Sequence, residues 1–293
     1  MHGSGDSLQW IIRSIPIFSM KYILVPTDLS PAANNAVRYA IQFAKAKKLK
    51  LKFFHAIHSL KNVHEFMENH PAEFKIMTDE AMAKVLGNIL AQFKHLKIKA
   101  GTPQVIVKMG ESFEGCLAEV ISDNKSAMII MGTHGRTNLK DVLLGSNASH
   151  VIATSPVPVL CVPAKCRYTP VKELTYFTDL NDLNNELHKV KGMARALTSK
   201  LSVVHIDYNW ARTADEEALL KRLATSKLEF HNAKASIDVP LSTHIKKIVR
   251  SRHSLPCLFH DRKSFLGRLF SGSNPEEAPT KVRAPVLSFQ RAA

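Results

Sequence analysis

Residues 131–150, MGTHGRTNLKDVLLGSNASH, hold three of the 12 glycines of this 293-residue chain. The stretch lies between an apolar run at 127–131, which predicts a buried strand, and a segment at 146–154 that predicts a short helix. Glycine adopts backbone angles that other residues avoid, and it lets a ligand approach the main chain closely. The start of a helix adds unpaired N–H groups and a partial positive charge. The stretch therefore predicts an anion site, with a tight connection that binds nothing as the alternative.

The bulk composition is that of a globular chain. Its length suits roughly two domains of about 150 residues each. A hydrophobic content of 45% and a charged content of 22% are ordinary for such a protein. The four cysteines form no C-x-x-C pair and predict reduced thiols in a cytoplasmic protein rather than a disulfide framework or a zinc site. The net charge of +15 favours anionic partners without naming one.

Residues 1–19 are predicted to be an N-terminal extension, either disordered or foreign to the natural protein. Their apolar residues are interrupted by Arg13 and Pro16 and are too few to span a membrane. The extension also lacks the basic leader of a signal peptide. The run from Met20 to Val25 is expected to be the natural beginning of the first strand, and no later run approaches membrane length, so no membrane association is expected.

Strand and helix patterns alternate from residue 21 onward. The expected strands are at 22–25, 49–57, 104–107, 127–131 and 157–162, and the expected helices are at 31–46, 72–97, 114–122 and 146–154. This order predicts an α/β fold with a parallel sheet covered by helices on both faces. In such sheets ligands bind at the carboxyl ends of strands where the winding order reverses. The glycine-rich stretch follows the carboxyl end of a strand.

The chain contains two copies of one pattern. VPTDLS at the end of the first strand reappears as YFTDLN, and FFHAI, GSN and PVL return as VVHID, GSN and PVL. The offset between the copies falls from 151 at Asp28 and Asp179 to 127 at Gly145 and Gly272. The second copy is therefore a duplicate that is shorter by 24 residues, and we expect the loss in its long second helix.

Pro26, Thr27 and Asp28 end the first strand, at the same edge of the sheet as the glycine-rich stretch. An Asp at this position can accept hydrogen bonds from ribose hydroxyls. Its other possible role is to cap the following helix, for which Asp28 or Ser30 ahead of Pro31 is well suited. Both roles are compatible if Ser30 caps the helix while Asp28 faces a ligand.

In this order and spacing the motifs resemble the universal stress protein family, in particular its tandem-domain members, from Met20 onward. Gly132, Gly135, Gly145 and Ser146 match the pattern G-x2-G-x9-G-[ST] of the ATP-binding members. Further matches are Pro26-Thr27-Asp28, His55, Met131 to Arg136, and the closing PVPVL at 156–160. Asn138 departs from the pattern, which more often has Gly there.

The resemblance implies two Rossmann-like α/β domains, similar to the adenine nucleotide alpha hydrolases, each with a five-stranded parallel sheet. It places a nucleotide-binding domain at 20–163, a linker at 164–172 and a shortened second domain at 173–291. It also implies that the last strands of the two domains, at 157–162 and 285–289, pair within the chain as a pseudo-dimer. Prolines beside these strands suit edge positions.

The resemblance further implies one site for ATP, or for AMP or ADP, with or without Mg²⁺. Asp28 would contact the ribose, the main chain at Ala56 the adenine, and the loop glycines the phosphates. The implied binding residues are Pro26, Thr27, Asp28, Ala56, Met131, Gly132, His134, Gly135, Arg136, Gly145, Ser146 and Asn147. Lys140 is more simply a solvated loop residue. No Lys follows Gly145, so the motif is not a P-loop, and no catalytic or metal-binding residue is predicted.

The second copy is predicted to be degenerate. Phe259 and Arg262 replace the first two glycines of the motif, so their side chains would obstruct a nucleotide. Glu276 and Glu277 follow the repeated GSN and would repel phosphates. We therefore expect one bound nucleotide per chain.

The expected function is ATP-dependent stress regulation through an unknown protein partner, with a homodimer as a further possibility. One alternative is slow Mg²⁺-dependent ATP hydrolysis, for which Asp28 and His134 are the titratable candidates. Another is nucleic-acid binding by the basic segment 244–268, which has no recognised reading motif. His55 and His58 could be metal ligands, but they lack a third partner and are predicted to be structural.

Overall fold

The structure is a computed structural model that describes residues 22–58, 62–124, 127–133, 145–208, 212–236, 239, 241–252, 254–260 and 284–291. The first half of the chain forms β1 (Tyr22–Pro26), α1 (Pro31–Lys47), β2 (Lys50–His58), α2 (Val63–Asn69), α3 (Pro71–His95), β3 (Gln104–Gly110), α4 (Phe113–Asn124), β4 (Met128–Gly132), α5 (Ser146–Thr154) and β5 (Val159–Val162). The second half forms β6 (Glu173–Thr178), α6 (Leu183–Ala196), β7 (Lys200–Asp207), α7 (Ala214–Ala224), β8 (Glu229–Lys234), α8 (Leu241–Arg252), β9 (Leu255–His260) and β10 (Val286–Gln290).

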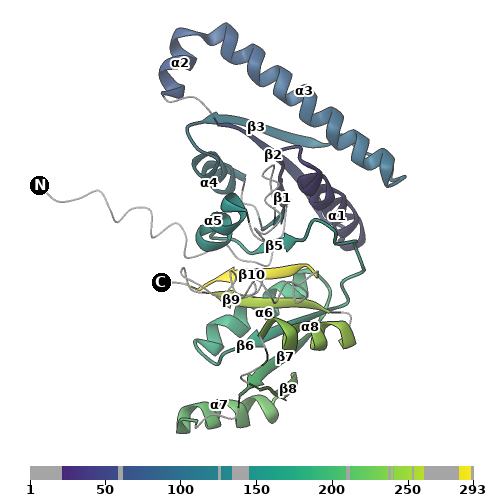
Figure 1. Cartoon of the computed structure of the whole chain (residues 1–293), viewed down its shortest axis with the longest axis vertical. Coiled ribbons are helices and arrows are strands. Elements are labelled where there is room, and N and C mark those ends of the chain that lie inside the picture. Colours follow the sequence, from purple (N-terminus) through teal and green to yellow (C-terminus); the bar gives the residue numbers. More distant parts are fainter. Residues whose placement is uncertain are drawn as a thin grey trace, which may run out of the picture.

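The ten strands of the described residues belong to one sheet, in the order β3-β2-β1-β4-β5-β10-β9-β6-β7-β8 (Figure 1). The five strands of each half are parallel to one another, as the alternating pattern predicts. The halves meet where β5 and β10 pair antiparallel, with Leu160 opposite Leu287. The pseudo-dimeric pairing expected of the last strands is therefore confirmed.

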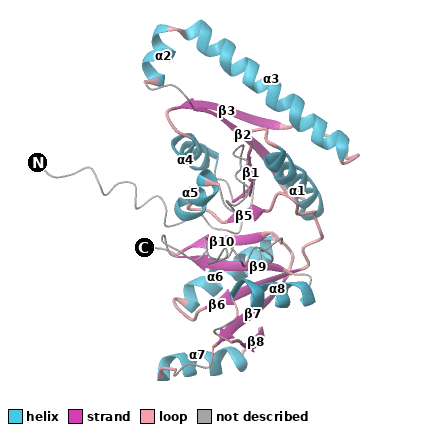
Figure 2. Ribbon diagram, viewed as in Figure 1, coloured by secondary structure: helices cyan, strands magenta, loops and turns pink. Residues whose placement is uncertain are grey.

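Helices cover both faces of the sheet (Figure 2). Two hydrophobic cores lie between the sheet and these helices. One core packs under α1, α3, α6 and α7, and the other under α4, α5 and α8. Each core contains side chains from both halves, such as Phe43 and Tyr176 on the first face. Both of these aromatic side chains are fully buried. Burial of a side chain of this size contributes about 1.5–3 kcal/mol, so the two halves share their stabilising contacts.

The first helix begins where its sequence predicts, at Pro31, and ends at Lys47, one residue later than expected. The Ser30 hydroxyl accepts a hydrogen bond from the main-chain N–H of Ala33, and Pro31 occupies the first helical position. Both features favour a helix start. The residue that caps the end of this helix, Lys48, has left-handed backbone angles (φ 54°). The following strand β2 can therefore begin at once.

The second half is shorter because one helix replaces two. In the first half the paired residues Lys52 and Gln104 are 52 positions apart, whereas their counterparts Ser202 and Glu229 are 27 apart. The intervening segment contains α2 and α3 in the first half and only α7 in the second. The missing residues thus fall in the helical connection between the second and third strands, as expected.

Polar contacts join the halves in addition to the β5–β10 pairing. The Lys47 ammonium at the end of α1 donates to the carbonyls of Val171 (2.6 Å) and Leu197 (2.5 Å) and to the Ser199 hydroxyl (3.0 Å). The Asn35 amide donates to a carbonyl beyond β5, that of Cys166, at 2.9 Å. The connection between β5 and β6 is therefore packed against α1. None of the helices in the described part of the chain is long and apolar enough to cross a membrane.

Candidate functional site

The strand order places one candidate site at the centre of the first half. β1 pairs with β2 on one side and with β4 on the other, so the winding order reverses between β1 and β4. The carboxyl ends beside this reversal are Pro26 and Gly132. Such a switch point is where open parallel sheets bind ligands.

The turn after β1 is held by its own main chain and by Thr27. The Thr27 N–H donates to the Phe54 carbonyl at 2.8 Å, and its hydroxyl accepts from the Leu29 N–H at 3.1 Å. Leu29 has left-handed backbone angles, with φ at 64°. This region is unfavourable for leucine, and such outliers persist where the surrounding structure determines the turn. The turn therefore fixes the position of the residue between them, Asp28.

Asp28 lies half-buried between the end of β1 and the start of α1. One carboxylate oxygen, Oδ1, accepts a hydrogen bond from the Ser30 N–H at 3.0 Å. Ser30 is the residue that caps α1. The sequence predicted that Ser30 caps the helix while Asp28 faces a ligand. This geometry is compatible with that prediction, because capping of α1 does not require the Asp28 carboxylate.

His55 supports the same turn from β2. Its Nδ1 lies 2.7 Å from the Thr27 carbonyl, and since a carbonyl only accepts, Nδ1 carries the hydrogen. This contact agrees with the structural role predicted for His55. No three His, Cys, Asp or Glu side chains that could hold a metal ion come together among the described residues.

The main chain at Ala56 lies two residues beyond Phe54, the last residue of β2 that pairs with β1. The Phe54 carbonyl accepts from Thr27 and therefore points towards β1. Main-chain groups two residues apart in a strand point to the same neighbour, so those of Ala56 point to the same side, past the last residue of β1. This is the position in which the resemblance implies an adenine edge.

The glycine-rich connection closes on itself at the end of β4. The Gly145 N–H donates to the Thr133 carbonyl at 2.7 Å, and the Thr133 N–H donates to the Val162 carbonyl at 3.2 Å. Thr133 is 1% exposed, so this junction is part of the protein interior. The start of α5 is thereby held beside the carboxyl end of β4, although residues 134–144 separate the two.

The start of α5 has a glycine as its cap residue. Gly145 occupies the capping position with φ at −64° and ψ at 155°, and a glycine has no side chain that could bond to the main-chain N–H groups of the first turn. Ser146 and Asn147 are exposed in this turn. Of the two properties that favour glycine, access to left-handed backbone angles is therefore not used at Gly145. The other property, close approach of a ligand to the main chain, is compatible with a glycine at the start of this helix.

The strand order thus gathers most of the predicted binding residues at one edge of the sheet. Those within the described structure are Pro26, Thr27, Asp28, Ala56, Met131, Gly132, Gly145, Ser146 and Asn147. His134, Gly135, Arg136, Asn138 and Lys140 lie outside the described residues. The binding roles stay predictions, whereas the common location is a structural result.

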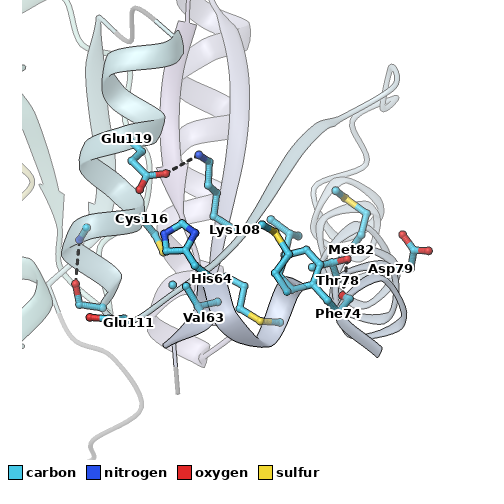
Figure 3. Close-up of a pocket in the computed structure, with 16 residues that line it drawn as sticks. Val63, His64, Phe74, Thr78, Asp79, Met82, Lys108, Glu111, Cys116 and Glu119 are labelled. Atoms are coloured by element: carbon cyan, nitrogen blue, oxygen red, sulfur yellow. Dashed lines mark hydrogen bonds and ion pairs between the residues drawn. The ribbon is translucent and has the colours of Figure 1, made fainter. Parts of the chain in front are cut away.

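A hollow that the sequence did not indicate lies at the outer strand of the first half. It has a volume of about 790 Å³ and is bounded by α2, α3, α4 and the end of β3. Lys108 and Glu119 form an ion pair of 2.6 Å across its wall, and Cys116 and His64 lie beside them (Figure 3). The helix α2 that forms part of this hollow is only seven residues long, too short for a clear periodic signal.

Comparison with known proteins identifies the family. The model of the universal stress protein family matches residues 20–163. Universal stress protein MJ0531 of Methanocaldococcus jannaschii is 31% identical over 147 residues, which cover 48% of this chain and 81% of that protein. The chain belongs to the universal stress protein family. A second relative of that family and organism, universal stress protein MJ0577, is 29% identical over 159 residues, 50% of this chain and 96% of that protein.

The fold likeness to the universal stress proteins extends over both halves. The crystal structure of a universal stress protein from Archaeoglobus fulgidus DSM 4304 covers 94% of this chain and 100% of its own, with a TM-score of 0.60. The sequence identity is 19%, so this likeness concerns the fold. It agrees with the two five-stranded units of the sheet and confirms the Rossmann-like α/β class.

Proposed function

We propose that the protein binds one adenine nucleotide, ATP, at the carboxyl edge of its first repeat and acts as a stress-response regulator. Membership of the family and the complete G-x2-G-x9-G-[ST] pattern support the ligand class. The observation that carries the proposal is the hydrogen bond from Gly145 to Thr133. It holds the start of α5, which has a glycine as its cap residue, against the end of β4 at the switch point, at the same edge of the sheet as Asp28.

The phosphates are proposed to bind the first turn of α5. The first N–H groups of a helix have no partner within the helix, and the helix dipole gives this end a partial positive charge. The exposed Ser146 hydroxyl, which donates to Asn147 Oδ1 at 3.4 Å in this structure, would turn to the phosphates as a further donor in the same turn. Gly135 and Arg136 are proposed to complete the phosphate site, and Mg²⁺ to enter only as a companion of the phosphates.

The ribose and base are proposed to lie between the ends of β1 and β2. Asp28 would accept from the ribose hydroxyls, and the main chain of Ala56 would meet the adenine edge. The Met131 side chain, 6% exposed, packs in the core beneath this edge and would support the base from below. Pro26, Thr27 and Gly132 would shape the floor, and His134 would close the site.

The regulatory part of the proposal follows from the connection to the β5–β10 junction. Thr133 bonds to Val162, and Val162 belongs to the strand that pairs with the second repeat. Binding at the loop that begins after Thr133 would therefore alter the edge nearest to the second repeat. We propose the two repeats, 20–163 and 173–291, as domains joined by the linker 164–172, with the nucleotide bound in the first.

Two measurements on the purified full chain test the proposal. Mass spectrometry of the nucleotide released by denaturation is expected to detect ATP, ADP or AMP. Calorimetric titration of the emptied protein with ATP is expected to reach one equivalent per chain. If no adenine nucleotide is released and the emptied protein does not bind ATP, the proposed ligand is wrong. If the titration reaches two equivalents per chain, the proposal of a single site is wrong.

A further inference from the structure

The second repeat retains the turn that positions Asp28 in the first. The Thr178 hydroxyl accepts from the Leu180 N–H at 2.9 Å, and Leu180 has a φ of 69°. Asp179 Oδ1 accepts from the Asn181 N–H at 3.1 Å. His205 Nδ1 lies 3.1 Å from the Thr178 carbonyl. Asp179 is therefore the counterpart of Asp28 in conformation as well as in sequence.

In the second repeat this carboxylate is engaged by the chain's own arginine. Arg291 follows β10 directly, and its Nη2 lies 2.5 Å from Asp179 Oδ1 while its Nε lies 2.6 Å from Glu186 Oε1. The side chain of Arg291 is 14% exposed and that of Glu186 is 2% exposed. The Tyr176 hydroxyl also donates to Glu186. In the first repeat, the position that corresponds to Arg291 by the offset of 127 is Ala164.

The ion pair with Glu186 holds Arg291 in place, because the buried Glu186 carboxylate requires a compensating positive charge. Burial raises the pKa of the Glu186 carboxyl, and the hydrogen bonds from Arg291 and Tyr176 oppose that rise. Loss of the guanidinium would leave a buried charge without compensation, which is costly. Arg291 therefore cannot leave Asp179 freely to admit another ligand.

Phe259 fills the adjoining position of the second repeat. Gly132 pairs with Val162 in the first repeat, and Phe259 pairs with Phe289 at the corresponding point of the second. The Phe259 ring stacks on Phe289 at 4.8 Å between centroids and meets Tyr176 edge-on at 5.8 Å. The glycine position of the first repeat is thus occupied by a packed aromatic ring in the second.

We infer that Arg291, supported by Phe259, is the residue that restricts nucleotide binding to the first repeat. Its guanidinium takes the place on Asp179 that the ribose hydroxyls of a nucleotide take on Asp28. The inference rests on the proposed function of the first repeat. The Asp179 side chain is 51% exposed, but its Oδ1 accepts from Arg291. A charge-assisted hydrogen bond of this kind is stronger than one from a neutral hydroxyl, so a ribose competes for this carboxylate at a disadvantage that the first repeat, with Ala164 in place of Arg291, does not impose.

Photolabelling of the full chain with 8-azido-ATP, followed by peptide mapping, tests this inference. Glu186→Gln with Arg291→Ala removes the guanidinium without leaving a buried charge, and a third change, Phe259→Ala, opens the adjoining position. We expect the amount of label in the second repeat of the triple variant to rise about tenfold above that of wild type, which corresponds to about 1.4 kcal/mol. The double variant, which keeps Phe259, is expected to show a smaller rise. The control Arg167→Ala, an exposed arginine beyond β5, is expected to change nothing. Unchanged label in the second repeat of both folded variants would overturn the inference.

A thermal double-mutant cycle provides a second readout that needs no nucleotide. Asp179→Asn and Arg291→Gln are expected to lower the melting temperature non-additively, because each removes the same ion pair. Additive effects would overturn the inference even if the triple variant failed to fold. Failure of the proposed function is distinguishable, since wild type would then carry no label in the first repeat while the cycle still detected coupling.

Discussion

Gly145 donates its main-chain N–H to the carbonyl of Thr133 at 2.7 Å, so the two ends of the segment 134–144 meet at the edge of the sheet. Thr133 is in turn bonded to Val162 of β5. The start of α5 therefore has a fixed place beside the end of β4 whatever path the intervening residues take. A helix start held at a switch point in this way is suited to an anionic ligand.

Substitutions at Asp28 and Ser30 separate ligand binding from helix capping. Ser30→Ala is expected to lower the free energy of unfolding by about 1 kcal/mol, because its hydroxyl caps α1, and to leave ATP affinity unchanged. Asp28→Asn is expected to weaken ATP binding about tenfold, because a carboxylate accepts stronger hydrogen bonds than an amide. Urea unfolding and calorimetry measure the two effects, with Asp79→Asn on the exposed side of α3 as the control. Equal loss of ATP affinity in the Ser30 and Asp28 variants would contradict the assignment.

Lys47 is expected to hold the two repeats together. Lys47→Met removes an ammonium group that donates to Val171, Leu197 and Ser199, all beyond the first repeat. Hydrogen bonds from a charged group contribute about 1.5–3 kcal/mol, so we expect a loss of about 2 kcal/mol in urea unfolding. Lys45→Met, an exposed change in the same helix turn, is the matched control. A Lys47 variant as stable as the control would show that the contact contributes nothing.

The buried thiols predict a loss of stability at alkaline pH. Burial raises the pKa of the Cys166 thiol from its ordinary 9.0 to about 11. A group whose pKa is higher in the folded state contributes stability that is complete below pH 9 and is lost as the pH rises towards 11. One thiol accounts for at most about 1.4 kcal/mol per pH unit in this window. Urea unfolding at pH 8 to 11 should therefore show a steeper decline for wild type than for Cys166→Ser, and parallel curves would contradict the prediction.

Much of the fold could be predicted because its signals are local and repeated. The apolar run at 127–131 indicated β4, and the TDL turn that occurs in both copies indicated the ends of β1 and β6. The change in offset between the copies located the shortened connection. The pairing of β5 with β10 came from the family resemblance, since no local pattern names the partner of an edge strand. The helix α2 was missed because seven residues give too few turns for a periodic pattern.

The site could be predicted in position but not in its details. The order of Asp28 and the loop glycines along the strands was sufficient to bring them to one edge. The left-handed Leu29 and the ordinary angles of Gly145 were not evident, because backbone angles depend on contacts far along the chain. The ion pairs of Arg291 were also unforeseen, since its partners Asp179 and Glu186 precede it by more than 100 residues.

Titration of ATP against Gly145→Val and its matched control Gly101→Val tests the central claim most directly. Gly101 is exposed, and a side-chain carbon added there would meet no other atom within 4 Å, so its substitution leaves the site untouched. Valine at Gly145 places a branched side chain where phosphates are proposed to meet the start of α5. We predict that ATP affinity falls at least about a hundredfold in Gly145→Val, the equivalent of about 2.7 kcal/mol, and is unchanged in the control. Wild-type ATP affinity in a folded Gly145→Val protein would contradict the account.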